Sequence, residues 1–125
     1  MLALGVAIAL LLPAAPDPGH SYYWRWSDGS RQVARTFTQQ EYGIASNLPG
    51  IIVTAEPAIP GQAVRLQFLR DGSWTTEGSA RTNAKGIATI HIDPACGQTW
   101  CDSTFAYRLT IGSQTARLTV TYAPE

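Results

Sequence analysis

The sequence has little charge, and its positive charge comes almost entirely from arginine. Charged residues make up 14% of the 125 residues, against roughly a quarter in an average globular protein. The 9 Lys and Arg balance the 9 Asp and Glu, and the zero net charge argues against a nucleic-acid-binding protein, which needs a basic face. Because 45% of the residues are hydrophobic, the chain is too apolar to be disordered, and its length predicts one domain.

Histidine and cysteine are also scarce, with two residues of each. A structural zinc site takes four ligands, mostly Cys and His, so the composition does not favour a transition-metal centre. The carboxylates are scattered without the spacing of a calcium loop, and the sequence contains no glycine-rich phosphate loop. We therefore expect neither a metal nor a cofactor.

The first fifteen residues differ from the rest of the chain. Residues 1–12 form an apolar run without a polar side chain, and Pro13, Pro16 and Pro18 follow it. The run is too short to span a bilayer, which takes about twenty residues, but it is typical of the core of a secretory signal peptide. A signal peptide normally starts with Lys or Arg, and this sequence has neither before Arg25. A buried N-terminal helix is the alternative. We expect residues 1–15 to be a signal peptide, or a membrane anchor if they are not removed, and the protein to be extracellular or in the cell envelope.

Apolar residues recur at every second position through most of the remaining chain, which is the period of a half-buried strand. In residues 104–111 and 115–122 one face is apolar and the other carries Thr and Arg, and Gly112-Ser113 between them is typical of a hairpin turn. Similar signals lie upstream in the segments 51–55, 64–68 and 87–92 and in the turns Asp71-Gly72 and 83–86. The pattern predicts an all-β, antiparallel β-sandwich over residues 49–125.

Residues 16–48 are predicted to form an N-terminal aromatic hairpin followed by a linker. Residues 21–26 are a strand candidate by aromatic content, and a turn signal separates them from a second candidate at 31–38. In the second strand, Val33 and Phe37 are the expected inward residues. The residues after this strand show no clear period, and we expect a loop there.

Four aromatic residues within five positions make the first strand unusual. One strand cannot bury all four, because neighbouring side chains point to opposite faces. In one register the core takes three of them and leaves Tyr23 and Arg25 outside, and in the other register the tryptophans are exposed. Exposed Trp and Tyr are common anchors at protein interfaces, and flat aromatic rings can stack on sugars. The candidate binding residues here are Tyr22, Tyr23, Trp24 and Trp26.

The two cysteines are expected to form a local disulfide. Cys96 and Cys101 are separated by four residues, which is not the spacing of a thioredoxin-type redox centre. In an exported chain such a pair favours a disulfide, and closing so short a loop contributes about 2 kcal/mol. The loop contains Trp100, which is a further candidate contact residue. Packing of Trp100 onto Phe105 or Tyr107 is the alternative.

The C-terminal two-thirds of the chain resembles a known family. The matching segments are 60–67, 72–76, 82–86 and 105–110, within residues 49–122. These segments are similar to the immunoglobulin-like repeat modules of secreted and surface proteins from actinobacteria. In that family they form a glycine turn into a strand, a tryptophan strand, a further turn and a tyrosine strand near the end. The resemblance implies an immunoglobulin-like sandwich that acts as a non-catalytic spacer or binding domain, without shared active-site residues.

A more distant resemblance is to the apoproteins of enediyne antibiotics from actinobacteria. Those proteins are small exported sandwiches with a short C-x4-C loop, like Cys96 to Cys101, and a stretch similar to residues 85–88. Their second disulfide has no counterpart in this chain. This resemblance implies a small-ligand carrier as an alternative function.

Catalysis is not favoured by the residues present. His91 lies in a predicted strand and Asp93 follows on the same face, but no serine or cysteine nucleophile has a matching context. A small hydrolase using these two residues is a second alternative, and we expect a protein that is not an enzyme. The favoured interpretation is an exported, non-catalytic immunoglobulin-like binding or structural module at the cell surface or envelope. Its expected partner is a protein or a cell-envelope polysaccharide, not nucleic acid, with membrane contact only if residues 1–15 stay attached.

Overall fold

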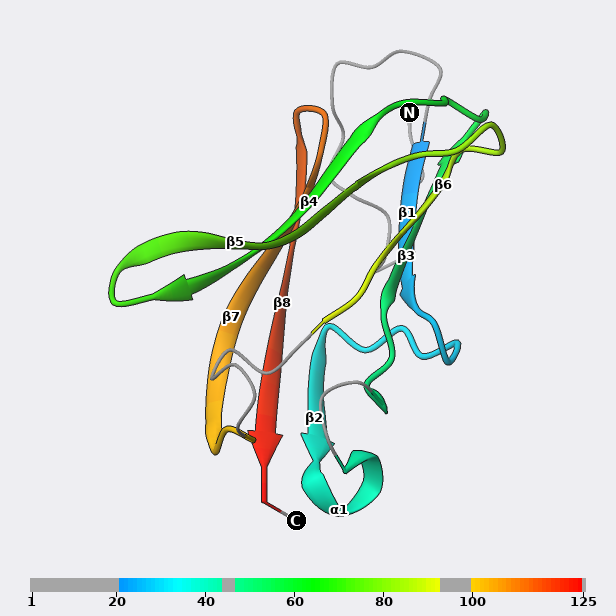
Figure 1. The fold of residues 1–125 in the computed structure, drawn as a ribbon. Helices are drawn as coiled ribbons and strands as arrows, with labels where there is room; N and C mark the ends of the chain where they lie inside the picture. The colour runs from blue at the N-terminus through cyan, green and yellow to red at the C-terminus, as the bar shows by residue number, and fades with distance from the viewer. Residues whose placement is uncertain (1–20, 44–46, 93–99, 125) are drawn as a thin grey trace.

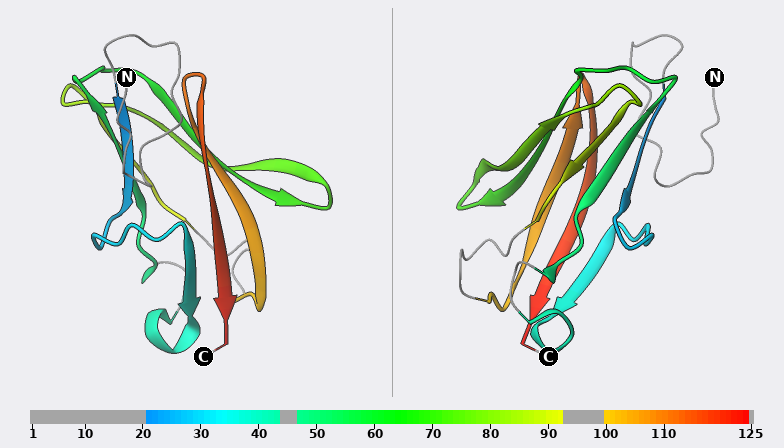
Figure 2. Two further views of the ribbon diagram at one scale, coloured as in Figure 1. Left: turned by 180° about the vertical axis from the view of Figure 1, so that it is seen from behind. Right: turned by 45° about the vertical axis from the view of Figure 1, so that its right-hand side comes forward.

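The computed structural model describes residues 21–43, 47–92 and 100–124, which form two facing β-sheets (Figure 1). In chain order the elements are β1 Ser21–Trp26, β2 Ala34–Thr38, α1 Gln39–Tyr42, β3 Ile51–Glu56, β4 Ala63–Arg70, β5 Ser73–Arg81, β6 Ile87–Ile90, β7 Ser103–Ile111 and β8 Gln114–Ala123. One sheet has the strand order β1-β3-β6, and the other has the order β2-β8-β7-β4-β5. Figure 2 shows the two layers from two further directions. The prediction of an all-β sandwich is confirmed.

The core lies between the two sheets and takes every second residue of most strands, because side chains alternate between the faces of a strand. The buried residues of the five-stranded sheet include Phe37, Val64, Leu66, Phe68, Tyr107, Leu109, Ile111, Leu118, Val120 and Tyr122. Those of the three-stranded sheet include Tyr22, Trp24, Trp26, Ile51, Val53, Ala55, Ala88 and Ile90. The alternation predicted for segments 51–55, 64–68, 87–92, 104–111 and 115–122 is therefore confirmed.

Tight turns join neighbouring strands of the five-stranded sheet. Gly112 and Ser113 connect β7 to β8 as a two-residue hairpin loop. Asp71 and Gly72 connect β4 to β5 and have φ angles of 52° and 79°, as a type I′ turn requires. Both turns were expected at these positions, and the end of the β4–β5 hairpin extends to the side of the sandwich (Figure 1).

The predicted N-terminal hairpin is wrong in its strand pairing. β1 pairs antiparallel with β3, whereas β2 lies in the other sheet and runs parallel to β8. Trp26 and Phe37 are both 0% exposed and meet edge to face across the interior, with ring centroids 5.4 Å apart. With the two strands in opposite sheets, both rings are buried between the layers. Each sheet therefore contains strands from both sides of residue 48, where a boundary between the hairpin and the sandwich was expected.

Arg35, not Val33, shares the inward face of β2 with Phe37. Phe37 is buried as predicted, but Val33 precedes the strand and is 44% exposed. The alternation along β2 then turns Arg35 inward, where only 9% of its surface remains exposed. A pattern of apolar residues alone does not predict an inward arginine.

The surroundings of Arg35 explain how a charged side chain is accommodated there. Its guanidinium carbon lies 5.1 Å from the Trp26 ring centroid and 4.8 Å from the Phe37 ring centroid. The guanidinium donates to both carboxylate oxygens of Asp28 and to the hydroxyl of Tyr42. A buried charge is tolerated when it is paired and hydrogen-bonded, and aromatic faces attract a guanidinium. Arg35 therefore links the turn after β1, the core and α1.

The segment expected to be a loop after β2 contains the short helix α1. The hydroxyl of Thr38 accepts a hydrogen bond from the backbone N–H of Glu41, which caps the first turn. Across the described ranges, none of the helical structure is long and apolar enough to cross a membrane.

The ion pair between Asp28 and Arg35 predicts a pH-dependent contribution to stability. Hydrogen bonding from Arg35 holds the pKa of Asp28 below its usual range. Such a carboxylate stabilises the fold above its unfolded pKa of about 3.9, and the contribution is lost as the pH falls through the folded pKa. Asp28→Asn should lower the free energy of unfolding by about 1 kcal/mol at neutral pH, a modest loss because the carboxylate is 41% exposed.

Urea unfolding at neutral pH and at a series of acidic pH values measures this effect. The deficit of Asp28→Asn should shrink once the pH is below about 3.9. Asp102→Asn, at an exposed position before β7, controls for the loss of one negative charge. A deficit that stays constant on acidification would contradict a stabilising ion pair.

Candidate functional site

Three of the candidate aromatic residues belong to the core. Tyr22 and Trp24 are 1% and 2% exposed, and Trp26 is fully buried. Trp24 and Trp26 pack edge to face with ring centroids 6.1 Å apart. Of the two registers considered for this strand, the observed one turns Tyr23 outward. Tyr22, Trp24 and Trp26 are therefore corrected from contact residues to core residues.

Tyr23 lies on the outer face of the three-stranded sheet beside a shallow hollow of about 330 Å³. The hollow is lined by Tyr23, Trp24, Arg25, Arg31, Ile52, Thr54 and Glu56. Its charged groups are of both signs, so it offers no field of one sign to a partner. Tyr23 is half-buried, and it is the residue of the first strand that keeps an exposed aromatic surface.

Trp100 packs onto the end of β8. Its indole Nε1 donates to the carbonyl of Ala123 at 2.7 Å, and its ring meets Tyr122 edge to face at 5.9 Å. The packing alternative considered for Trp100 is therefore what the structure shows, with Tyr122 as the partner ring instead of Phe105 or Tyr107. Cys101 beside it is buried, and the described ranges contain no free cysteine. Its predicted disulfide partner, Cys96, lies outside the described residues.

The residues considered for catalysis are not assembled into a site in the described structure. His91 is exposed just after β6, and Asp93 lies outside the described residues. Within the described ranges, no group of three or more His, Cys, Asp or Glu side chains is placed to hold a metal ion.

The outer face of the five-stranded sheet carries four arginines, which we call the arginine face. They are Arg65 on β4, Arg81 on β5, Arg108 on β7 and Arg117 on β8. The alternation that buries the apolar residues of these strands turns the arginines outward. The strand register brings them together, since Arg108 lies directly opposite Arg117 and Arg65 lies opposite Thr110, two residues along β7 from Arg108.

Trp74 on β5 holds two of these arginines. The guanidinium carbon of Arg108 lies 4.3 Å from the Trp74 ring centroid, and that of Arg117 lies 5.4 Å away. Arg108 Nε also donates to the side-chain oxygen of Gln67 at 2.6 Å. Like charges directly opposite each other in a sheet repel. The negative face of an aromatic ring attracts both cations and so offsets part of the repulsion between them. The ring thus keeps two cations side by side on one surface.

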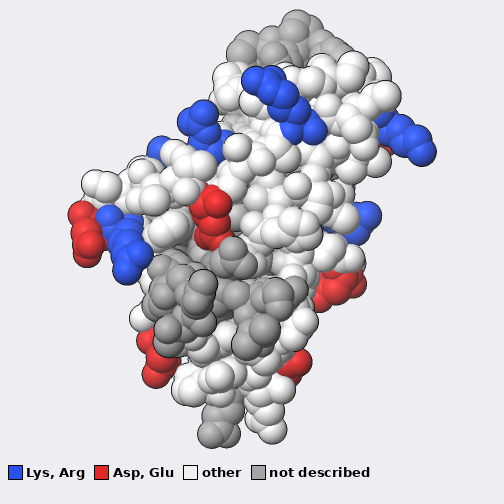
Figure 3. Space-filling view, viewed as in Figure 1, with Lys and Arg blue, Asp and Glu red and all other residues white. Residues whose placement is uncertain are grey.

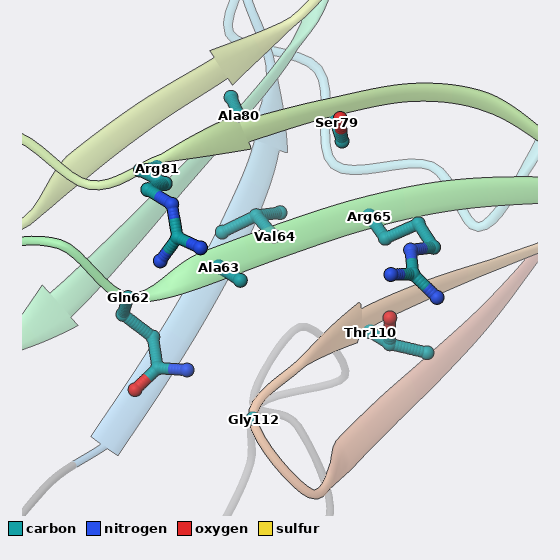
Figure 4. A pocket seen from close by; sticks show the side chains of 9 residues that line it. All are labelled: Gln62, Ala63, Val64, Arg65, Ser79, Ala80, Arg81, Thr110 and Gly112. Atoms are coloured by element: carbon teal, nitrogen blue, oxygen red, sulfur yellow. The ribbon is translucent and has the colours of Figure 1, made fainter.

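Arg65 and Arg81 flank a second hollow of about 380 Å³ on the same face. Figure 4 shows the two guanidinium groups on either side of Ala63, whose small side chain leaves the space between them open. Gln62, Ser79 and Thr110 add polar groups to the lining. Arg81 donates to the carbonyl of Gly61 at 2.8 Å, and Arg65 has no hydrogen-bond or ion-pair partner among the described residues.

No carboxylate in the described structure neutralises the arginine face. Glu77 is the acidic residue of the five strands, and it is half-buried on the inner side. Its side chain reaches the buried Tyr107, where burial first, and then Tyr122 and Glu77, raise the pKa of the Tyr107 hydroxyl above its usual range. The described ion pair joins Asp28 to Arg35, away from this face. In Figure 3 most positive side chains lie in the upper half of the molecule and most negative ones in the lower half.

The described residues thus define a small two-sheet β-sandwich with a cationic outer face on its larger sheet. Comparisons with protein-family models, with curated proteins and with solved structures find no match to this chain. The arginine face was not singled out from the sequence. The sequence shows Thr and Arg on the polar sides of the predicted strands. It does not show that the arginines of four strands lie close together, because that depends on the order of the strands in the sheet.

Burial of Trp26 and exposure of Tyr23 predict very different effects of substitution. Trp26→Ala should lower the free energy of unfolding by about 3–5 kcal/mol, because it leaves a large cavity between the sheets. Tyr23→Ala should cost about 1 kcal/mol or less, because the side chain packs on the outer surface. Urea unfolding followed by circular dichroism compares the two variants. Equal stability of the two variants would show that Trp26 is not the core residue described above.

Proposed function

We propose that this protein is an exported, non-catalytic immunoglobulin-like module that binds a partner at the cell surface or in the cell envelope. The observation that carries the proposal is the arginine face, where four cations and Trp74 share one polar sheet surface without a described carboxylate. Arg65 has no partner among the described residues, and the other three guanidinium groups have N–H groups left over after their contacts within the protein, so all four remain available to an external anion. A face of this kind serves binding better than catalysis, because it combines cations and hydroxyls without a general base or nucleophile.

The strand order supports the immunoglobulin-like part of the proposal. Immunoglobulin-type sandwiches place their first, second, fourth and fifth strands in one sheet and their third, sixth and seventh in the other. Here β1, β3 and β6 correspond to the first, second and fifth strands, and β4, β7 and β8 correspond to the third, sixth and seventh. The smaller sheet has no counterpart of the fourth strand, and the larger sheet has β5 added beside β4 and β2 added beside β8. The correspondence agrees with the resemblance of residues 49–122 to immunoglobulin-like modules.

Export is supported by the sequence of residues 1–15 and by the predicted pairing of Cys96 with Cys101. Disulfides persist in oxidising compartments outside the cytosol. A module that works at the cell surface needs both a route out of the cell and a surface that meets its partner there.

The small-ligand carrier receives less support from the structure. The interior between the sheets is filled by large side chains such as Trp24, Trp26 and Tyr107, and both hollows described above lie on outer faces. His91 and Asp93 gain no further support as a hydrolytic pair.

Binding to isolated cell envelopes tests the proposal. The full chain, tagged at its C-terminus and expressed in its source cells, should be found in the envelope or medium.

The purified protein should sediment with envelopes, and Arg65→Gln with Arg117→Gln should weaken that binding about tenfold. Arg25→Gln with Arg31→Gln is the matched control, because it removes the same charge from the other sheet. A protein retained in the cytosol, or equal loss of binding in both double variants, would contradict the proposed function.

A further inference from the structure

Resting on the proposed function, we infer that the partner is an acidic polysaccharide that binds across the arginine face. Its carboxylate groups pair with the arginines, and a sugar ring packs against Trp74. The inference depends on three features of this face, which are its free guanidinium edges, its two separate anion positions and its hydroxyl-rich surroundings.

The first feature is the position of two guanidinium groups against Trp74. A guanidinium that stacks on an aromatic ring contacts it through its flat face, which leaves its in-plane N–H groups for other partners. Arg108 uses Nε on Gln67, which leaves its two terminal nitrogens as a fork for a carboxylate. Contact with Trp74 restrains Arg108 and Arg117, so binding an anion orders fewer free side-chain rotations.

The second feature is the presence of two anion positions along the sheet. One is the hollow between Arg65 and Arg81, which stays open because Ala63 separates them (Figure 4). The other is the pair Arg108 and Arg117 beside Trp74. Arg108 lies two residues, about 7 Å, along β7 from the residue opposite Arg65. A linear polymer with acidic groups at intervals fits both positions, whereas a single small anion fills one.

The third feature is the chemistry around the arginines. The outward positions of β7 and β8 are rich in threonine, and the hydroxyls of Thr104 and Thr121 lie 2.9 Å apart. Hydroxyls and amides suit the hydroxyl groups of a glycan, and the exposed part of Trp74 that its two guanidinium neighbours leave uncovered can pack against a sugar ring. The core of a protein interface is usually more apolar than this face.

Nucleic acid is a weaker fit than an acidic glycan. Duplex DNA carries one negative charge per about 1.7 Å of its axis and is bound by strongly basic surfaces. This chain has no net charge, and its positive side chains at this face are limited to four arginines. Widely spaced carboxylates match that number better than a dense phosphate backbone.

Binding of purified polymers to the full chain tests the inference, with polygalacturonate as the acidic glycan. Dextran supplies sugar without charge, polyglutamate supplies carboxylates without sugar, and duplex DNA supplies phosphates. At low salt we expect polygalacturonate to bind about tenfold or more tightly than each of the other three polymers. Its affinity should fall as the salt concentration rises. Equal binding of polyglutamate or DNA would overturn the inference, as would equal binding of dextran.

Substitutions locate the binding on the arginine face. Arg65→Gln with Arg117→Gln should weaken polygalacturonate binding about tenfold, while Arg25→Gln with Arg31→Gln should change it less than about twofold. Trp74→Leu should weaken binding of both polymers, because it releases Arg108 and Arg117, and should weaken polygalacturonate more, because the contact with the sugar ring is lost as well. Ala63→Gln, which fills the hollow at an exposed position without changing the charge, should also weaken binding. Circular dichroism confirms that each variant is folded.

The inference and the proposed function fail in different ways. If envelopes bind the protein through the arginine face but purified polygalacturonate binds no better than dextran, the partner is not an acidic glycan of this kind and the inference is wrong. If the protein neither leaves the cytosol nor binds envelopes, the proposed function is wrong whatever the polymer assay shows.

Discussion

The contact between Trp26 and Phe37 across the interior is the constraint on which the rest of the structure depends. The two residues belong to different sheets, so their contact ties the sheets together where the chain passes from one to the other between β1 and β2. The guanidinium of Arg35 lies against both rings. It also donates hydrogen bonds to Asp28 and Tyr42 and so holds their side chains in place. Aromatic rings continue from it through the core in edge-to-face and tilted pairs. These pairs link Trp24, Trp26, Phe37, Tyr42, Tyr122, Trp100, Phe105, Phe68 and Tyr107. Packed aromatic rings and the buried guanidinium of Arg35 therefore join β1, β2 and α1 to the rest of the sandwich.

This arrangement separates the stabilising side of each strand from the side that meets solvent. The tryptophans of β1 are committed to the core, and Trp74 on β5 is the tryptophan placed among outward cations. Arg65 and Arg117 are exposed and lie outside the core, so those positions can serve recognition. The zero net charge of the chain conceals this division, because the acidic residues that the structure describes lie on the inner side, in turns and on other surfaces.

Local patterns predicted the strands and turns well, because period-two alternation and glycine turns are properties of neighbouring residues. Residues 104–111 and 115–122 and the turn at Asp71 and Gly72 formed as expected. The N-terminal hairpin failed because the turn signal after Trp26 is used to leave one sheet for the other, and a local signal does not distinguish the two outcomes. Arg35 was missed because its burial depends on Asp28 and two rings that only the folded chain brings together. The arginine face escaped prediction for a related reason, since its members come from four strands whose order is a property of the whole sheet.

The parallel pairing of β2 with β8 has a consequence for how the protein is made. β2 and its hydrogen-bonding partner β8 are separated along the chain by the strands β3 to β7, so the pair cannot form until all of these strands have been synthesised. Folds that depend on contacts between distant parts of the sequence fold slowly, because the chain must first be closed over a long loop. The hairpins β4–β5 and β7–β8 can form locally, while β2 stays unpaired until β8 is available. Under the export proposed above, such a chain would reach the membrane before the pairing of β2 with β8 completes the sandwich.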